Sequence, residues 1–213
     1  KVFCAPKKDS ILIMNPSVAM YGFYASINEN KVIKLNLNEN FEIVKDDFIA
    51  ISNDIKCKIF FLCSPNNPTG NSIEDIEFYI QNFNGIVVVD EAYIEFSGKK
   101  SCTELLEKYP NLIVLQTFSK AWGMAGARVG IAYSSQEIIK LINTVKAPYN
   151  VNFLSLNKAI EIINKQEVVN SNIENTLNEI SWLKNEFQSV KCIKKVYPRD
   201  GNFFLIVFEK VEK

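Results

Sequence analysis

Short apolar runs without polar alternation limit the fold of this chain more than any other feature. Residues 59–63 (IFFLC) and 86–89 (IVVV) are apolar at every position. A strand that is apolar on both sides is typical of a parallel sheet with both faces covered by helices. Runs of this length are also too short to span a bilayer. The sequence therefore predicts an α/β fold, with a mostly parallel sheet and helices on both faces.

Segments with helical or turn character separate these runs. Residues 17–28 carry apolar side chains at helical spacing, and residues 46–51 fit one short helix. Ser72, with Asp75 three residues later, predicts the N-cap of a helix that ends near Phe83. Residues 1–10 read as the end of a helix and a turn, and residues 101–109 as a short helix. The predicted strands are 11–14, 31–35, 58–63, 86–89, 111–115 and 128–133.

The pattern becomes mainly helical beyond Tyr133. We expect helices over residues 136–145, 152–165 and 167–190, followed by short strands over 193–197 and 202–208. This change predicts two domains. Residues 1–165 would form a large domain and residues 166–213 part of a smaller α+β C-terminal domain.

Composition excludes several classes of function. The 24 basic and 24 acidic residues give a net charge of zero, which indicates neither nucleic acid nor a membrane as a partner. The chain has no histidine, so acid–base chemistry must use Lys, Tyr, Asp, Glu or Cys. The five cysteines include no C-x-x-C pair, which argues against a disulfide framework or a metal site and favours the cytoplasm.

Polar side chains follow the ends of several predicted strands. Asn67 follows residues 58–63, Asp90 and Tyr93 follow residues 86–89, and Lys120 follows residues 111–115. Alone, each has a simpler explanation: a turn amide, a helix cap, a packed ring or a solvated amine. Ligands of parallel sheets bind at the carboxyl ends of the strands. Four such side chains at successive strand ends therefore predict one site.

Arg128 joins this site by a separate argument. Residues 118–127 are too few for a parallel crossover with its helix, so residues 128–133 should return antiparallel and begin at the same sheet edge. The hydroxyls of Thr117 and Ser119 and the guanidinium of Arg128 suit a phosphate. A lysine amine such as that of Lys120 can form a Schiff base with a carbonyl, which is how pyridoxal phosphate is held.

With these residues in place, the sequence resembles the fold-type I pyridoxal-phosphate enzymes of the class II aminotransferase group. Within that group it is most similar to histidinol-phosphate aminotransferases, mainly through residues 89–96 and 146–150. The matching stretches are Asn15-Pro16-Ser17 with Met20-Tyr21, Ser64 to Gly70, Val87 to Phe96, Thr117 to Gly130, Ala147 to Asn152 and Asp200 to Phe204.

The resemblance implies a role for each candidate residue. Lys120 would form the Schiff base with pyridoxal 5'-phosphate and then move a proton to and from the substrate, and Asp90 would pair with the ring nitrogen. Tyr93 and Asn67 would bind the phenolic oxygen. The phosphate would be bound by Thr117, Ser119 and Arg128.

The resemblance also implies substrates and an assembly. The expected reaction is transamination of L-histidinol phosphate with 2-oxoglutarate in histidine biosynthesis, that is, of a small-molecule amino donor with a 2-oxo acid. The expected assembly is a homodimer. Family members commonly have cis peptide bonds before the prolines of both Asn-Pro steps, so we predict cis bonds at Asn15-Pro16 and Asn67-Pro68.

Three departures accompany the resemblance. Val18 stands where the family places an aromatic ring against the cofactor, so an aliphatic contact or Tyr21 would replace it. The family has further segments before Lys1 and after Lys213, and a chain without them is not expected to turn over. Asn202 is a match for a substrate-side asparagine.

Three alternatives to the expected function stay open. The protein could be another class II aminotransferase, an amino-acid-phosphate decarboxylase of the same fold, or a non-catalytic cofactor-binding sensor or degenerate domain.

Overall fold

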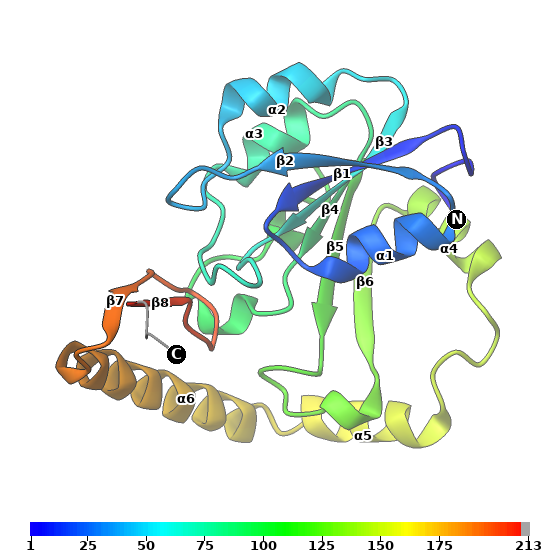
Figure 1. Ribbon diagram of the computed structural model, residues 1–213. Helices are drawn as coiled ribbons and strands as arrows, with labels where there is room; N and C mark the ends of the chain where they lie inside the picture. The colour runs from blue at the N-terminus through cyan, green and yellow to red at the C-terminus, as the bar shows by residue number, and fades with distance from the viewer. Residues whose placement is uncertain (210–213) are drawn as a thin grey trace.

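The computed structural model describes residues 1–209, and a six-stranded sheet with strand order β2-β1-β3-β4-β5-β6 lies at its centre (Figure 1). Strands β1 to β5 pair in parallel, and β6 runs antiparallel to β5. The mostly parallel sheet and the antiparallel return are both as predicted. The strands are β1 (Ser10–Asn15), β2 (Lys31–Asn36), β3 (Cys57–Cys63), β4 (Ile86–Asp90), β5 (Leu112–Thr117) and β6 (Gly130–Ser134).

Neighbouring phenylalanines of β3 show how both faces of the sheet are covered. The Phe60 ring packs against Phe48 of α2 (Lys45–Ser52), with ring centroids 5.5 Å apart. The Phe61 ring stacks on Tyr21 of α1 (Ala19–Ile27), with centroids 4.6 Å apart. Successive strand residues point to opposite faces, so α1 and α2 cover opposite sides of the sheet. Helix α3 (Ile76–Gln81) joins α2, because its Tyr79 also contacts Phe48.

The register of the strands brings their carboxyl ends to one level. Cys63 of β3 pairs with Asp90 of β4, and Asp90 pairs with Leu115 of β5. Across the antiparallel pair, Thr117 lies opposite Gly130. The segments that follow β3, β4 and β5 and the one that precedes β6 therefore all start from the same edge of the sheet.

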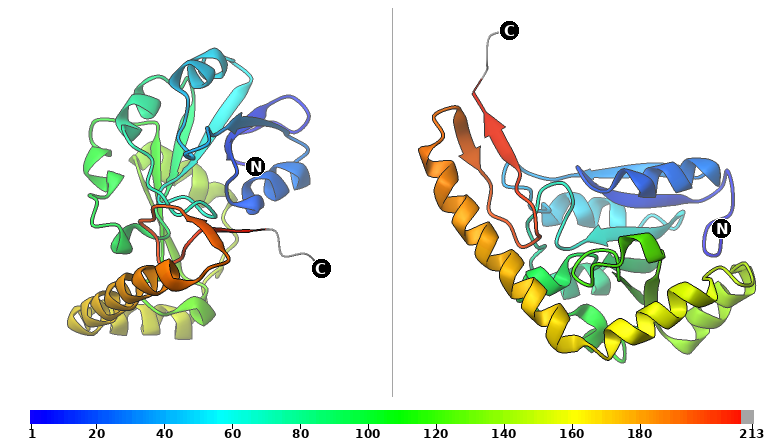
Figure 2. Two further views of the ribbon diagram at one scale, coloured as in Figure 1. Left: turned by 60° about the vertical axis from the view of Figure 1, so that its left-hand side comes forward. Right: turned by 90° about the horizontal axis from the view of Figure 1, so that it is seen from below.

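The last two α-helices lead to a second, two-stranded sheet. Figure 2 shows α6 (Gln166–Glu186) extending from α5 (Phe153–Ile163) to the pair β7 (Ile193–Val196) and β8 (Ile206–Phe208). The domain boundary near residue 165 stays a prediction. The other elements are α4 (Gln136–Val145), η1 (Ile94–Phe96), η2 (Cys102–Leu105), η3 (Ala125–Ala127) and η4 (Phe187–Ser189).

Three local predictions were wrong. Residues 1–9 contain a turn rather than a helix end, and Lys7 has a positive φ of 63° that a helix does not accommodate. Ser72 does not cap α3, because α3 starts only at Ile76 with Asp75 at the N-cap position, and the Ser72 Oγ has no hydrogen-bond partner among residues 1–209. The helix expected over 101–109 is the short 3₁₀ helix η2, which Ser101 caps.

The loop that follows β3 is fixed by the side chain of a buried asparagine. Asn66 Nδ2 donates to the Pro16 carbonyl (3.0 Å) and to Thr69 Oγ1 (2.8 Å), while its Oδ1 accepts from Ser17 Oγ (2.8 Å). The peptide bonds Asn15-Pro16 and Asn67-Pro68 are cis, as predicted, and Ser64-Pro65 is cis as well. The hydrogen bonds of Asn66 to Pro16 and Ser17 hold the loops after β1 and β3 together.

The same loop is joined to the C-terminal part of the chain at Gly70. The Gly70 carbonyl accepts hydrogen bonds from the N–H groups of Asp200 (2.7 Å) and Gly201 (3.1 Å). Gly70 has a φ of +85°, and a Cβ there would lie 3.2 Å from Arg199 Cβ. Both the backbone conformation and the close approach therefore favour glycine at this position.

Candidate active site

Asp90 ends β4 with its carboxylate held by two donors. The Tyr21 hydroxyl donates to Oδ2 at 2.6 Å, and the Ala92 N–H donates to Oδ1 at 3.1 Å. Burial raises the pKa of the Asp90 carboxyl above its ordinary value, and these two hydrogen bonds oppose that rise. The arrangement presents an acidic group at the carboxyl edge of the sheet, where it can pair with a protonated ring nitrogen.

Tyr21 anchors Asp90. Its ring is buried and stacks on Phe61 with an interplanar angle of 12°. Burial raises the pKa of its hydroxyl strongly, and the neighbouring Cys63 and Asp90 raise it further, so the group stays a donor. Because the ring is already stacked on Phe61, the structure favours an anchoring role over the cofactor-stacking role considered from sequence.

Lys120 and Tyr93 lie next to each other. Lys120 follows β5, is exposed, and places its Nζ 5.1 Å from the centroid of the Tyr93 ring. Tyr93 is buried and packs edge-on against Phe203, with centroids 5.0 Å apart. The structure thus brings the amine and the phenol together from two different strand ends, with the amine open to a ligand.

The two hydroxyls of the predicted phosphate site are also adjacent. Thr117 Oγ1 lies 3.0 Å from Ser119 Oγ and accepts a hydrogen bond from the Ser119 N–H (3.1 Å). Arg128 is exposed, with a left-handed φ of 56°, and its Nη1 donates to the Ala125 carbonyl (2.9 Å). Arg128 and the half-buried Asn67 both lie on loops at this edge. Their roles as ligands stay predictions.

Sequence reasoning missed the network around Glu91. This side chain is only 1% exposed, and its carboxylate accepts from Ser101 Oγ (2.6 Å), Cys102 N–H (2.6 Å) and Gln116 Nε2 (2.9 Å). The three donors satisfy the oxygens of this buried side chain. The network ties the end of β4 to β5 next to Asp90. In the sequence, the signal for this network is a second acidic residue, Glu91, directly after Asp90 at the end of a buried strand.

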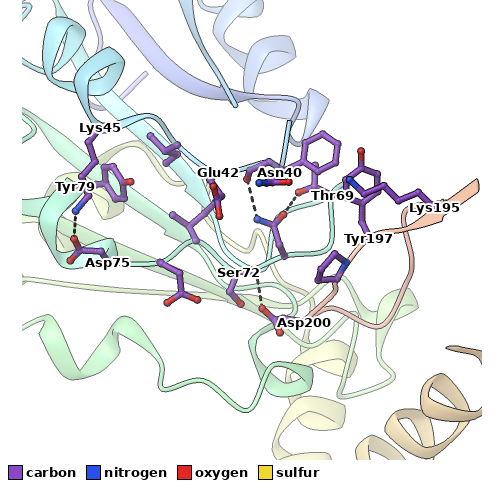
Figure 3. Close-up of a pocket in the computed structure, with 16 residues that line it drawn as sticks. Asn40, Glu42, Lys45, Thr69, Ser72, Asp75, Tyr79, Lys195, Tyr197 and Asp200 are labelled. Carbon is purple, nitrogen blue, oxygen red and sulfur yellow. Dashed lines mark hydrogen bonds and ion pairs between the residues drawn. The ribbon is translucent and has the colours of Figure 1, made fainter. Parts of the chain in front are cut away.

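A cavity of about 720 Å³ lies elsewhere, between residues 40–45, residues 69–79 and residues 195–200 (Figure 3). It contains none of the predicted site residues. Several of its charged groups already have partners, since Lys45 pairs with Asp75 and Asp200 accepts from the Ser72 N–H. Lys120 and the other predicted site residues lie outside this cavity, and the candidate active site is the group of side chains around Lys120.

The fold is a mostly parallel α/β sheet, and the candidate side chains lie on segments that follow or precede its strands at the carboxyl edge. The family model described as "Aminotransferase class I and II" matches residues 1–212. The chain belongs to that family.

Curated relatives also support membership of the chain in this family. The chain is 42% identical over 207 residues to the histidinol-phosphate aminotransferase of Bacteroides thetaiotaomicron, covering 96% of this chain and 60% of that protein. It is 43% identical over 205 residues to the protein of the same name from Cytophaga hutchinsonii, covering 95% and 59%. The chain thus spans about three fifths of these relatives' length.

Solved structures show the same fold. The histidinol-phosphate aminotransferase from Clostridium acetobutylicum superposes with a TM-score of 0.88 at 26% identity, covering 95% of this chain and 63% of that one. The enzyme of that name from Sinorhizobium meliloti, in complex with pyridoxal-5'-phosphate, superposes with a TM-score of 0.86 at 19% identity, covering 95% and 56%. At that identity the second likeness concerns the fold alone.

The Tyr21–Asp90 contact leads to a test that requires no cofactor. In a Tyr21→Phe variant, we expect the pKa of the Asp90 carboxyl to rise further, because the hydrogen bond from the Tyr21 hydroxyl stabilises the charged carboxylate. Carbon-13 NMR titration of the Asp90 carboxyl measures the change. Tyr24→Phe, an exposed tyrosine on the same helix, is the matched control. An unchanged pKa in Tyr21→Phe would contradict the anchoring role.

Proposed function

We propose that the protein carrying this chain is a pyridoxal-phosphate-dependent aminotransferase that transfers the amino group of L-histidinol phosphate to 2-oxoglutarate in histidine biosynthesis. The observation that carries the proposal is the exposed Lys120 amine 5.1 Å from the ring centroid of the buried Tyr93, on segments that follow neighbouring strands of which one ends at Asp90. The amino donor is inferred from the names of relatives that are 42–43% identical over nearly the whole chain.

The chemistry of these side chains fits the cofactor. Asp90 would pair with the ring nitrogen, and Tyr93 and Asn67 would bind the phenolic oxygen. Thr117, Ser119 and Arg128 would bind the phosphate, since hydroxyls and a guanidinium are strong donors to such an anion. Bound pyridoxal phosphate supplies a carbonyl for attachment to an amine and a ring that withdraws electrons from the substrate's α carbon.

The chain's own residues would then have distinct tasks. The Lys120 amine would hold the ligand covalently and afterwards accept and return the proton at the substrate's α carbon. Tyr21 and the Ala92 N–H would keep Asp90 oriented and ionised toward the ring. Glu91 would keep β4 and β5 in register, so that the segments bearing Tyr93 and Lys120 leave the sheet side by side.

We further propose that the protein is a homodimer. Large apolar side chains are exposed on two parts of the surface: Met20, Phe23, Tyr24 and Ile27 on α1, and Tyr149, Phe153, Leu154, Leu156, Ile160 and Ile163 on or next to α5. Patches of this kind support burial against further protein. Sedimentation of the whole protein, with a dimer mass expected, tests the assembly.

The cytoplasm is the proposed location. Four of the five cysteines are buried free thiols, and the exposed Cys192 is also a free thiol, which fits a reducing compartment. Among residues 1–209, no helix combines the length and apolar character needed to cross a membrane.

Half-reactions of the whole protein test the function. With pyridoxal phosphate bound, we expect histidinol phosphate to convert the cofactor absorbance faster than phenylalanine, by roughly 100-fold or more in kcat/KM. 2-Oxoglutarate should then restore the starting spectrum. Because histidinol phosphate has no carboxyl group, an amino-acid phosphate is assayed beside it, and release of carbon dioxide from that donor in place of amino transfer would point to a decarboxylase. Binding without any conversion would point to a sensor. Either result would overturn the proposal.

A further inference from the structure

The turn that carries Lys120 is tied to the segment that carries Tyr93 by a hydrogen bond between side chains. Trp122 lies two residues after Lys120, and its indole Nε1 donates to Glu95 Oε1 at 2.8 Å. Glu95 lies in η1, two residues after Tyr93. The bond therefore joins the segments that follow β4 and β5, next to the position where each presents a predicted site residue.

The backbone makes the position of Trp122 bear directly on Lys120. The Gly123 N–H donates to the Lys120 carbonyl at 3.0 Å, which closes a tight turn over residues 120–123. Gly123 has a φ of +68°, a conformation that favours glycine. Ala121, inside the turn, is buried. Trp122 therefore lies inside the turn that begins at Lys120, so the bond to Glu95 fixes this turn from within.

The Trp122 ring fills the space between two hydrophobic clusters. It packs against the cluster of Phe118, Met124 and Val129, with 5.1 Å between the Phe118 and Trp122 ring centroids. It also packs against the cluster that contains Tyr93, Phe96 and Ala121. The ring thus already has apolar contacts on both sides, and the bond to Glu95 adds a directional constraint to this packing.

A glutamate at position 95 is unfavourable for the stability of the fold, which indicates a role beyond packing. Its Oε2 is buried and has no hydrogen-bond partner among residues 1–209. Burial raises the pKa of the Glu95 carboxyl. Glu95 lies between Tyr93 and Phe96 in the sequence, and these two residues belong to a hydrophobic cluster that Ile173 and Leu177 of α6 also contact. Burying an unpaired carboxylate oxygen is unfavourable, and local violations of this kind are characteristic of functional sites.

We propose that Glu95 is a positioning residue that acts through Trp122 to fix the Lys120 turn against Tyr93. This inference depends on the proposed function, because the position of Lys120 matters for the reaction only if its amine acts on the cofactor and the substrate. Glu95 itself touches neither Lys120 nor a ligand in this account. Its effect is to orient the amine relative to the phenol, and errors of about 1 Å in such geometry can slow a reaction by roughly 100-fold.

The test uses a double-mutant cycle in the whole protein. Glu95→Leu removes the acceptor, Trp122→Phe removes the donor but keeps a ring, and the double variant removes both. Glu95→Gln keeps an acceptor oxygen and is the conservative variant. Trp182→Phe, at the exposed tryptophan of α6, is the matched control for loss of an indole. Thermal unfolding of each variant establishes that it is folded.

Two readouts are compared. The first is the rate of the first half-reaction with the amino donor, expected to fall by about 10- to 100-fold in both single variants and no further in the double variant. Glu95→Gln and Trp182→Phe should remain within about threefold of the parent protein. The second, without cofactor, is the rate of Lys120 acetylation relative to the exposed Lys184, expected to change by about threefold or more in the same variants.

Multiplicative losses in the double variant would overturn the inference, as would a Glu95→Gln variant as slow as Glu95→Leu. If the parent protein fails to convert histidinol phosphate, the proposed function fails. The acetylation rates then decide the inference by themselves: an unchanged Lys120 rate in both Glu95→Leu and Trp122→Phe refutes it, and a matched change in both supports it.

Discussion

Replacing Lys120 with alanine is expected to abolish covalent attachment of pyridoxal phosphate and to reduce amino transfer to the limit of detection. The amine would perform two tasks, attachment of the ligand and proton transfer at the substrate's α carbon. Loss of a positioned acid–base group alone slows a reaction by roughly 10²- to 10⁴-fold. Because Lys120 is exposed and its amine lies over the Tyr93 ring without an ion pair among the described residues, we expect the variant to fold normally.

The measurement is the absorbance of the protein with pyridoxal phosphate before and after borohydride, followed by peptide mass spectrometry. The reduced adduct is expected on the peptide that contains Lys120 and not in the Lys120→Ala variant. Lys184→Ala, an exposed lysine of α6, provides the control. An adduct that forms at the parent rate in Lys120→Ala would show that another lysine carries the ligand.

Local pattern was enough to predict the sheet and its edge. Runs such as residues 59–63 are apolar on both faces, which only a sheet covered on both sides accommodates. Asp90 and Lys120 then followed from the rule that ligands bind at strand carboxyl ends. The antiparallel return to Gly130 followed from the short connection of residues 118–127. Each of these predictions uses residues close together in the sequence.

The parts that were missed depend on contacts between distant residues. Ser72 has the local signature of a helix cap, but α3 starts only at Ile76, and the segment around Ser72 is held by a hydrogen bond from its N–H to Asp200, 128 residues further on. The Tyr21 hydroxyl reaches Asp90 across 69 residues, and Trp122 reaches Glu95 across 27. Periodicity carries no information about such pairs, because a polar side chain on a helix or turn is compatible with solvent as well as with a buried partner.

Replacing Asp90 with asparagine is expected to slow amino transfer strongly while preserving the fold. The variant keeps the shape of the side chain and removes the negative charge that would face the ring nitrogen. Loss of one preorganised charge-stabilising group slows a reaction by roughly 10²- to 10³-fold. Half-reaction rates with histidinol phosphate measure the effect, and Asp47→Asn on the exposed face of α2 is the control. A rate within about threefold of the parent protein would remove Asp90 from the catalytic group.

The same variant is expected to make the cofactor-free protein more stable near neutral pH. Burial raises the pKa of Asp90 in the folded state, so the native protein holds this proton more tightly than the unfolded chain does. Its contribution to stability is therefore fully present below the ordinary pKa of 3.8 and is lost as pH rises through the raised folded value. Asparagine can accept from the Ala92 N–H and donate to the Tyr21 oxygen without this penalty. Thermal unfolding of the cofactor-free protein should give a higher Tm for Asp90→Asn at pH 7, with the difference shrinking toward pH 4. A lower Tm at pH 7 would show that the ionised carboxylate stabilises the empty site.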